Sequence, residues 1–232
     1  MPESFLSPDQ LGILEAMDVQ VWRQRRPDAE RLDLPSPAVA PAPVEAADWG
    51  PLAAAVAACE RCRLHASRRQ TVFGVGNPDA DWMIIGEAPG ADEDRQGEPF
   101  VGRAGQLLNE MLRAAGFARS DVYIANILKC RPPNNRDPQA DEVDACADYL
   151  RRQVEMVAPR LILAVGRIAA QNLLHRDEPV GRLRGVVHRL EPSGVPVVVT
   201  YHPAYLLRSP AQKRKAWADL CLARSIADPV ST

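Results

Sequence analysis

Short apolar runs alternate with amphipathic stretches along most of the chain. Four apolar runs have the length of buried strands, and each is followed by a glycine or a polar residue. They lie at 80–86, 121–128, 160–165 and 195–201, and helical spacing occurs at 102–115, 139–158 and 210–226. Buried strands separated by helices are typical of parallel sheets covered on both faces. The pattern therefore predicts an α/β three-layer sandwich around a central, mostly parallel sheet of short strands.

The first 46 residues follow a different pattern. Residues 7–26 have the apolar positions of a short helix, and Pro35, Pro37, Pro41 and Pro43 follow in a stretch rich in alanine and valine. Such a proline-rich stretch is extended and semi-rigid, and it does not form a core of its own. We expect a flexible N-terminal appendage at 1–46 and a single domain at 47–232.

Composition and charge exclude few classes of protein. The chain has 232 residues, of which 46% are hydrophobic and 25% charged, as in soluble globular proteins. It has no apolar run long enough to span a membrane and no basic, apolar start typical of a signal peptide, so we expect a cytoplasmic protein. The net charge is −2, but residues 1–50 hold nine acidic and four basic residues. The remaining 182 residues are net positive, which is compatible with DNA binding.

Five cysteines suggest a metal centre. Cys59 and Cys62 are separated by two residues, a spacing that directs both thiolates toward one point, and Cys130 and Cys146 follow. Disulfides are rare in the cytosol, whereas four thiolates suit either zinc or an iron–sulfur cluster. Cys221 lies in the predicted C-terminal helix, where we expect it in the core.

Polar residues at strand ends are candidates for a site. Ligands of doubly wound sheets bind at the carboxyl ends of the strands, so Glu87, Asn126 and His202 are expected to converge there. Phe100 lies in a stretch of polar residues and glycines, which favours a pocket rim where the ring could stack on a base. Each residue also has an ordinary structural interpretation, such as a turn-closing asparagine or a histidine that ends a strand.

Four segments together carry a family resemblance. They are 86–94 (GEAPGADED), 98–108 (EPFVGRAGQLL), 126–135 (NILKCRPPNN) and 202–208 (HPAYLLR). With the cysteine spacing, they resemble the family 4 uracil-DNA glycosylases, the iron–sulfur members of the uracil-DNA glycosylase superfamily. The resemblance covers roughly residues 50–226 and implies the three-layer fold described above.

The resemblance implies a cofactor and a reaction. Cys59, Cys62, Cys130 and Cys146 would hold a structural 4Fe–4S cluster, although spacing alone leaves zinc as an alternative. The enzyme would hydrolyse the N-glycosidic bond of deoxyuridine in single- or double-stranded DNA during base excision repair. Because that bond is shielded in the stack, the base must leave the helix first.

The resemblance also assigns a uracil pocket. Its residues would be Gly86, Glu87, Ala88, Phe100, Asn126 and His202. Phe100 would stack on the ring, and the Asn126 amide would pair with the uracil edge and discriminate against cytosine. His202 would donate to a uracil carbonyl oxygen as negative charge develops on the base.

Contacts with DNA are implied for the segment after His202. Leu206, Leu207 and Arg208 would fill the gap left by the extruded base. Residues 213–215, a lysine, an arginine and a lysine, would hold phosphates.

Two positions depart from the best-known uracil glycosylases. Ala88 stands where those enzymes have an aspartate that positions the attacking water, so Glu87 and Glu93 become candidates for that role. Ala204 replaces the serine of the usual His-Pro-Ser motif. We therefore expect a weaker enzyme that retains activity.

Partners and rival functions complete the expectations. Residues 11–27 (LGILEAMDVQVWRQRRP) are similar to the N-terminal peptide of the psi subunit of the bacterial clamp-loader complex, which suggests a tethered docking peptide. A helix folded back on the domain is the alternative. We expect a nucleoid-associated monomer. The rival functions are a replication-associated DNA-lesion-binding protein with the same fold and little catalysis, and an unrelated zinc-stabilised α/β protein.

Overall fold

The computed structural model describes residues 49–227. The expected appendage at 1–46, with the docking segment at 11–27, lies outside the described residues. Within them, no helix is both long and apolar enough to cross a membrane.

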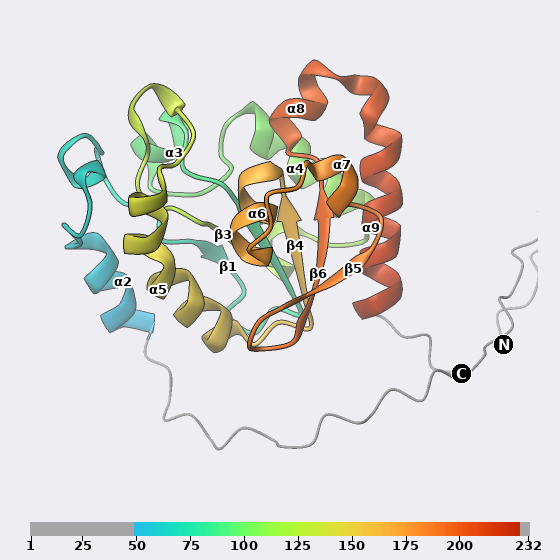
Figure 1. Ribbon diagram of the computed structural model, residues 1–232, viewed down its shortest axis with the longest axis horizontal. Helices are drawn as coiled ribbons and strands as arrows, with labels where there is room; N and C mark the ends of the chain where they lie inside the picture. The colour runs from blue at the N-terminus through green and yellow to red at the C-terminus, as the bar shows by residue number, and fades with distance from the viewer. Residues whose placement is uncertain (1–48, 228–232) are drawn as a thin grey trace, which may run out of the picture. The chain divides into compact units, whose positions relative to one another are not determined.

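A six-stranded sheet forms the centre of the domain (Figure 1). The strands are β1 (Val75–Gly76), β2 (Trp82–Gly86), β3 (Tyr123–Asn126), β4 (Leu161–Val165), β5 (Val187–Leu190) and β6 (Val195–Thr200). Their order is β1-β3-β2-β4-β6-β5. The four inner strands are parallel, and both edge strands pair antiparallel with their neighbours. The mostly parallel sheet predicted from the sequence is confirmed, and the two antiparallel edges are additional.

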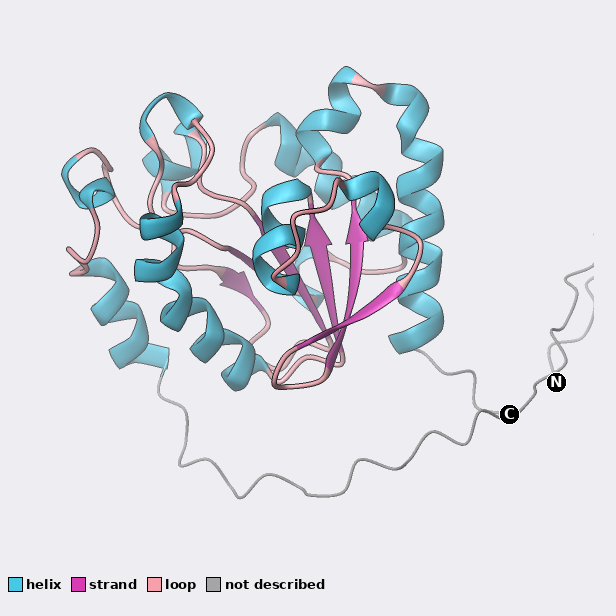
Figure 2. Ribbon diagram, in the orientation of Figure 1, coloured by secondary structure: helices cyan, strands magenta, loops and turns pink. Residues whose placement is uncertain are grey.

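Helices cover both faces of this sheet (Figure 2). They are α2 (Trp49–Ala57), α3 (Ala91–Gln96), α4 (Arg103–Ala114), α5 (Ala140–Val157), α6 (Arg167–Leu174), α7 (Val180–Leu183), α8 (Pro203–Arg208) and α9 (Lys213–Ala227). Short 3-10 turns lie at Arg63–Ala66, Arg119–Asp121, Pro133–Asn135 and Pro210–Gln212. The three predicted helices correspond to α4, α5 and the turn at 210–212 followed by α9.

Alternating side chains of the strands build two cores. In β2, Met83 and Ile85 face the layer of α5 and α6, whereas Trp82 and Ile84 face the layer of α4 and α9. This follows from the two-residue repeat of a strand, and it explains why β2 is an unbroken apolar run. The three-layer sandwich predicted from the sequence is therefore confirmed.

One prediction about the core was wrong. Cys221 is exposed, because α9 turns Ala216, Leu220 and Ala223 toward the sheet. A cysteine one residue after Leu220 is rotated by about 100° from that buried line. Its side chain therefore faces away from the core.

The chain changes direction beside β2. From β2 it passes to β3 on one side of the sheet and later to β4 on the other side. Loops that leave adjacent strands in opposite directions open a crevice at their carboxyl ends, where ligands of such folds bind. The loops that follow β2, β3 and β6 meet at this end.

Candidate active site

A cavity of about 480 Å³ lies at the carboxyl ends of the inner strands. Its lining includes Glu87 and Ala88 after β2, Phe100 before α4, Asn126 of β3 and His202 after β6. The structure therefore brings together residues that the sequence placed up to 115 positions apart. The convergence expected from strand order is what the fold produces.

Gly86 makes the meeting of these side chains possible. A Cβ atom at this position would lie 2.4 Å from Asn126 Oδ1 and 2.6 Å from Phe100 Cζ. Gly86 is not part of the cavity lining, but its missing side chain lets the amide and the ring approach the end of β2. Its expected contribution through the backbone is compatible with this position.

Phe100 is held in an unusual backbone conformation. Its φ angle is 55°, in the left-handed region that residues other than glycine rarely adopt. A Cβ at Gly105 would lie 1.7 Å from the Phe100 carbonyl oxygen, so α4 approaches this backbone closely. The ring is only 7% exposed and stacks 5.7 Å from the His202 ring, with 27° between the planes. Phe100 thus forms a wall of the cavity and is more buried than the rim position expected from the sequence.

Glu93 connects the two loops that form this wall. One carboxylate oxygen accepts a hydrogen bond from the Gly90 N–H at 3.1 Å. The other accepts from Val101 N–H at 3.0 Å and Gly102 N–H at 3.1 Å. A carboxylate with three backbone donors is well satisfied, so Glu93 fixes the loop after β2 against the loop that carries Phe100.

Asn126 ends β3 with its side chain toward the cavity. The residue is 3% exposed, and its backbone register places it opposite Gly86. Among residues 49–227, its side-chain amide forms no hydrogen bond with another residue. A buried amide requires partners, so this group is suited to pair with a polar ligand edge.

His202 is a neutral hydrogen-bond donor. The Ala204 N–H donates to His202 Nδ1 at 3.1 Å, which leaves the proton of the neutral ring on Nε2. Burial, together with the positive charge of Arg208, lowers the pKa of His202 to about 4, against the opposing effect of Glu93. At pH 7 the ring therefore offers an N–H without carrying a charge.

Glu87 is the carboxyl group with the most perturbed pKa in the cavity. Burial raises the pKa of Glu87 to about 7, and the charge of Asp137 adds to this effect while Arg167 opposes it. Arg167 forms an ion pair with Asp137. Asp137 also lines the cavity. The sequence did not indicate Asp137, in the loop before α5, or Arg167, at the start of α6, because only the fold brings them beside Glu87.

The segment expected to contact DNA divides into buried and exposed residues. Leu206 is 1% exposed and belongs to the core beneath α8, whereas Leu207 is 37% exposed. Arg208 lines the cavity. A core leucine cannot enter a duplex without unfolding α8, so the position of Leu206 disagrees with its expected role, and Leu207 is the better candidate.

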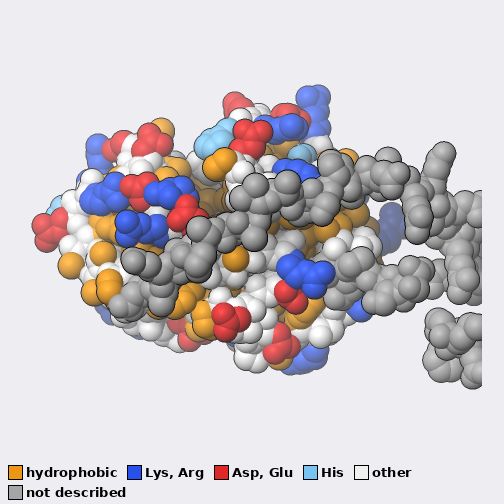
Figure 3. All heavy atoms as spheres, turned by 90° about the horizontal axis from the view of Figure 1, so that it is seen from below, with side chains coloured by type: hydrophobic (Ala, Val, Ile, Leu, Met, Phe, Trp, Pro, Cys, Tyr) orange, Lys and Arg blue, Asp and Glu red, His pale blue; other side chains and the backbone are white. Residues whose placement is uncertain are grey.

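The basic residues 213–215 form the exposed first turn of α9. In Figure 1 this turn follows α8 at the same end of the molecule as the cavity. Figure 3 shows the opposite end, where basic and acidic side chains are interspersed. Three adjacent cations beside the cavity are therefore suited to the phosphates of a nucleic acid.

The four candidate metal-binding cysteines share one region of the structure. Cys130 and Cys146 are buried with Leu64 and Leu128, and Cys62 packs against them. Cys59 is close enough to contribute to the raised pKa of both Cys130 and Cys146, after the larger effect of burial. In the part of the chain that the structure describes, no group of three or more such side chains is placed to hold a metal ion. The proximity of the four cysteines agrees with the expectation from their spacing, but in the described residues they are not arranged as ligands of a metal ion.

Donors and cations surround these thiols. Arg68 Nη1 lies 3.1 Å from Cys130 Sγ, and the Lys129 N–H donates to Cys146 Sγ at 3.3 Å. Burial raises the pKa of Cys130, which Arg68 opposes, and it raises the pKa of Cys146 to about 11. Burial also lowers the pKa of Lys129 to about 8. The sequence analysis did not single out Lys129. Its place at the end of an apolar run, directly before Cys130, is the signal that could have indicated a buried cation.

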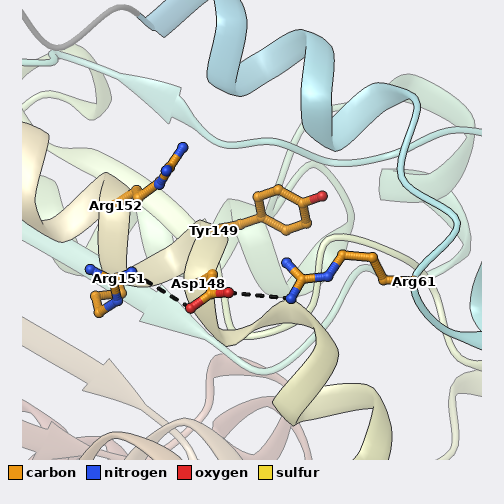
Figure 4. Close-up of a pocket in the computed structure, with 5 residues that line it drawn as sticks. All are labelled: Arg61, Asp148, Tyr149, Arg151 and Arg152. Atoms are coloured by element: carbon orange, nitrogen blue, oxygen red, sulfur yellow. Dashed lines mark hydrogen bonds and ion pairs between the residues drawn. The ribbon is translucent and has the colours of Figure 1, made fainter.

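A second cavity, of about 210 Å³, lies on the flank of α5. Figure 4 shows Asp148 between Arg61 and Arg151, with Tyr149 beside the Arg61 guanidinium. These groups are exposed and the acid already has two basic partners. Exposed ion pairs contribute little and leave no unsatisfied group, so this cavity is not a candidate catalytic site.

Comparisons with known proteins agree with the geometry. The family model described as the uracil DNA glycosylase superfamily matches residues 73–221. The type-4 uracil-DNA glycosylase of Archaeoglobus fulgidus is 46% identical over 170 residues, which are 71% of this chain and 85% of the relative. The type-4 enzyme of Pyrobaculum aerophilum is also 46% identical over 170 residues, covering 71% of this chain and 87% of the relative. That of Thermotoga maritima is 44% identical over 153 residues, 65% of this chain and 79% of the relative. The resemblance identified from the four sequence segments is confirmed: the chain belongs to the uracil DNA glycosylase superfamily.

Proposed function

We propose that this chain is a uracil-DNA glycosylase that hydrolyses the N-glycosidic bond of deoxyuridine, releases uracil and leaves an abasic site for base excision repair. One observation carries the proposal: an unpaired amide, a neutral histidine N–H and an aromatic ring line the same cavity. Together these groups match the edge, the carbonyl oxygen and the face of an extruded pyrimidine. The similarity to type-4 uracil-DNA glycosylases supports the same substrate.

The roles within the pocket follow from charge. Asn126 pairs with the uracil edge, and Phe100 stacks on the ring. As the bond breaks, negative charge moves onto the base, and His202 Nε2–H donates to its carbonyl oxygen. A neutral donor suits this task because the low pKa of His202 keeps the ring uncharged in the resting enzyme. Glu87 and Ala88 complete the pocket lining, and Gly86 leaves room for the amide and the ring.

Glu87 is the proposed partner of the attacking water. The Glu93 carboxylate already accepts three backbone hydrogen bonds, whereas no hydrogen bond to the Glu87 carboxyl is formed among the described residues. A carboxyl with a pKa of about 7 is substantially ionised at physiological pH and can orient water. This leaves Glu93 the task of holding the two pocket loops together.

Leu207 and Arg208 are the proposed contacts with the opened duplex, and residues 213–215 hold the phosphates. Leu207 is exposed at the same end of the domain as the cavity, so it can occupy the space that the base leaves. Leu206 supports this role from below by anchoring α8 in the core.

The four cysteines are proposed to bind a 4Fe–4S cluster. The donor set fits an anionic centre, since thiols are enclosed by apolar side chains, and N–H groups of Arg68 and Lys129 point at sulfur. The Lys129 ammonium is also buried, and its hydrogen-bond partners are neutral oxygens. When bound, the cluster supplies structural cross-linking of the segments at 59–62 and 130–146. Iron content with absorbance in the visible range would support this cofactor, and stoichiometric zinc would refute it.

The decisive experiment uses a labelled oligonucleotide with one uracil. Wild type, His202→Ala and Asn126→Ala are compared by strand breakage after alkaline treatment. We expect breakage by the wild type and a fall of about 100-fold or more in both variants, the loss typical of removing a transition-state donor. A wild type with its metal bound that binds this DNA without breakage would refute the glycosylase and support the lesion-binding function.

Three further proposals concern the whole chain. Residues 11–27 dock on the clamp-loader machinery through the linker that ends at residue 46, so deletion of 1–46 should abolish capture by purified clamp loader without affecting excision. Unchanged capture would refute the docking.

Residues 47–232 form the glycosylase domain, which acts in the cytoplasm near the nucleoid as a monomer. Light scattering at two protein concentrations tests the monomer, and a dimer mass would refute it.

A further inference from the structure

The segment 126–130 forms a wall shared by the pocket and the cysteines. On the pocket side, Ile127 N–H donates to the Gly86 carbonyl at 2.9 Å and Leu128 N–H to the Glu87 carbonyl at 3.1 Å. On the other side, Lys129 N–H donates to Cys146 Sγ, and the Cys130 side chain is buried beside Leu128. Five consecutive residues therefore contact both sites.

Lys129 is the residue of this wall whose side chain connects β3 to α5. It is 1% exposed, which is rare for a lysine. Its ammonium group donates to the Asn126 carbonyl oxygen at 2.9 Å and to Gln153 Oε1 at 2.6 Å. The first bond restrains the residue whose amide faces the cavity. The second attaches that arrangement to α5, the helix that carries Cys146.

Charge links Lys129 to the cysteines. Among residues 49–227, no carboxylate forms an ion pair with its ammonium group, and both hydrogen-bond acceptors are neutral. A buried cation needs a compensating negative charge, because transfer of an ammonium group out of water is costly. The Lys129 N–H donates to Cys146 Sγ at 3.3 Å, so four metal-bound thiolates would supply a net negative charge close to this residue.

We infer that Lys129 is a positioning residue that couples the cysteine centre to the uracil pocket: its ammonium group balances the charge of the centre and holds Asn126 in the orientation that reads the base. The inference rests on the proposed function and on metal binding by the four cysteines. It predicts that loss of the ammonium group weakens metal retention and uracil excision together.

The test compares Lys129→Met with Tyr123→Phe. Methionine keeps the length of the side chain but removes its charge and both hydrogen bonds. Tyr123→Phe removes a hydroxyl from the same buried network, where Gln153 Nε2 donates to it at 3.1 Å, without touching Lys129. Three quantities are measured on metal-loaded full-length protein: the rate of metal loss to a chelator, kcat and KM for uracil excision, and affinity for uracil-free DNA.

We expect Lys129→Met to accelerate metal loss and to lower kcat, each by about 10- to 100-fold, the size of effect seen for partners of metal ligands. KM and the affinity for uracil-free DNA should stay within about twofold of wild type, and Tyr123→Phe should stay within about twofold in every measurement. Unchanged metal loss or unchanged kcat in Lys129→Met would overturn the inference.

A second variant keeps the proposal testable if Lys129→Met does not fold. Gln153→Glu retains the shape of its partner but places a carboxylate beside the ammonium group, and it also removes the N–H that donates to the Phe73 carbonyl and the Tyr123 hydroxyl, the second of which Tyr123→Phe controls for. The cation is then neutralised locally while its bond to Asn126 remains. We expect faster metal loss with near-normal kcat in freshly loaded protein, and equal metal retention would overturn the charge argument. A wild-type protein without excision refutes the proposed function and this inference with it, whereas normal variants of an active enzyme refute only the inference.

Discussion

The substitution Gly86→Ala tests the geometry of the pocket with the smallest possible change. An added Cβ would lie 2.4 Å from Asn126 Oδ1, whereas real Cβ contacts essentially never fall below 3.0 Å. The amide must therefore move by at least 0.6 Å, or β2 must move by as much. Phe100 Cζ would lie 2.6 Å from the same Cβ, so the added methyl group cannot avoid Asn126 by moving toward the Phe100 ring.

The displacement translates into a loss of rate. Misplacement of a reacting group by about 1 Å costs about 100-fold, so a shift of this size should lower kcat by about 10- to 100-fold. Overpacking should also lower the free energy of unfolding by about 1–3 kcal/mol. Single-turnover excision of uracil measures the first effect, and denaturant unfolding measures the second.

Gly181→Ala is the matched control, because no atom lies within 4 Å of a Cβ at that position. It should leave kcat unchanged and, because alanine favours the helix α7, raise the free energy of unfolding by at most about 1 kcal/mol. Affinity for uracil-free DNA should be normal in both variants, since neither touches the exposed DNA-contacting residues. A Gly86→Ala enzyme with wild-type kcat would refute the argument that Asn126 and Phe100 must meet at the end of β2.

The other predictions concern pH and the DNA-contacting helix. The excision rate of the wild type should rise through pH of about 7 as Glu87 ionises. Glu87→Gln should lower the rate by about 10- to 100-fold and remove this rise. A rise that persists in the pH-rate profile of the variant would exclude Glu87 as the partner of the attacking water. The pKa of His202 is about 4 in the folded protein against 6.5 for a free histidine, so the unfolded chain takes up a proton first as pH falls. The free energy of unfolding of the wild type should therefore fall between pH 6.5 and 4. In urea unfolding, His202→Ala should remove up to about 3 kcal/mol of that fall. The same pH dependence of stability in both proteins would contradict the lowered pKa of His202. Leu207→Ala should slow excision from double-stranded DNA more than from single-stranded DNA at unchanged stability, and Leu206→Ala should cost about 2–5 kcal/mol of stability; the reverse pattern would reassign the two leucines.

The sequence predicted the inner sheet because its chemistry is local. Strands β2 and β4 are unbroken apolar runs, since both their faces are buried. The edge strands escaped prediction for opposite reasons: β1 has only two residues, and β5 alternates between exposed and half-buried positions without a strong apolar face. Edge strands need few apolar residues, so hydrophobic patterning detects them poorly.

The pocket was predictable in outline but not in its electrostatics. Parallel strand ends dictate that Glu87, Asn126 and His202 meet, and the structure agrees. The tautomer of His202 depends on the Ala204 N–H, and the pKa of Glu87 is raised by burial and then by the charge of Asp137. Burial of Leu206 likewise depends on how α8 sits on the core. Such effects arise from tertiary packing, which a single sequence does not encode locally.

The order in which the strands and the site residues occur along the chain has a consequence for synthesis of the protein. All four proposed metal ligands lie between Cys59 and Cys146, within the part of the chain that forms β1, β2 and β3, whereas His202 follows β6 at the far side of β4. A chain growing from the ribosome therefore contains these four cysteines, together with Asn126, before His202 has been made. The cavity is complete only when β4 has been added beside β2 and β6 beside β4, because His202 follows β6. The protein is thus unable to attack a base until its last third has folded.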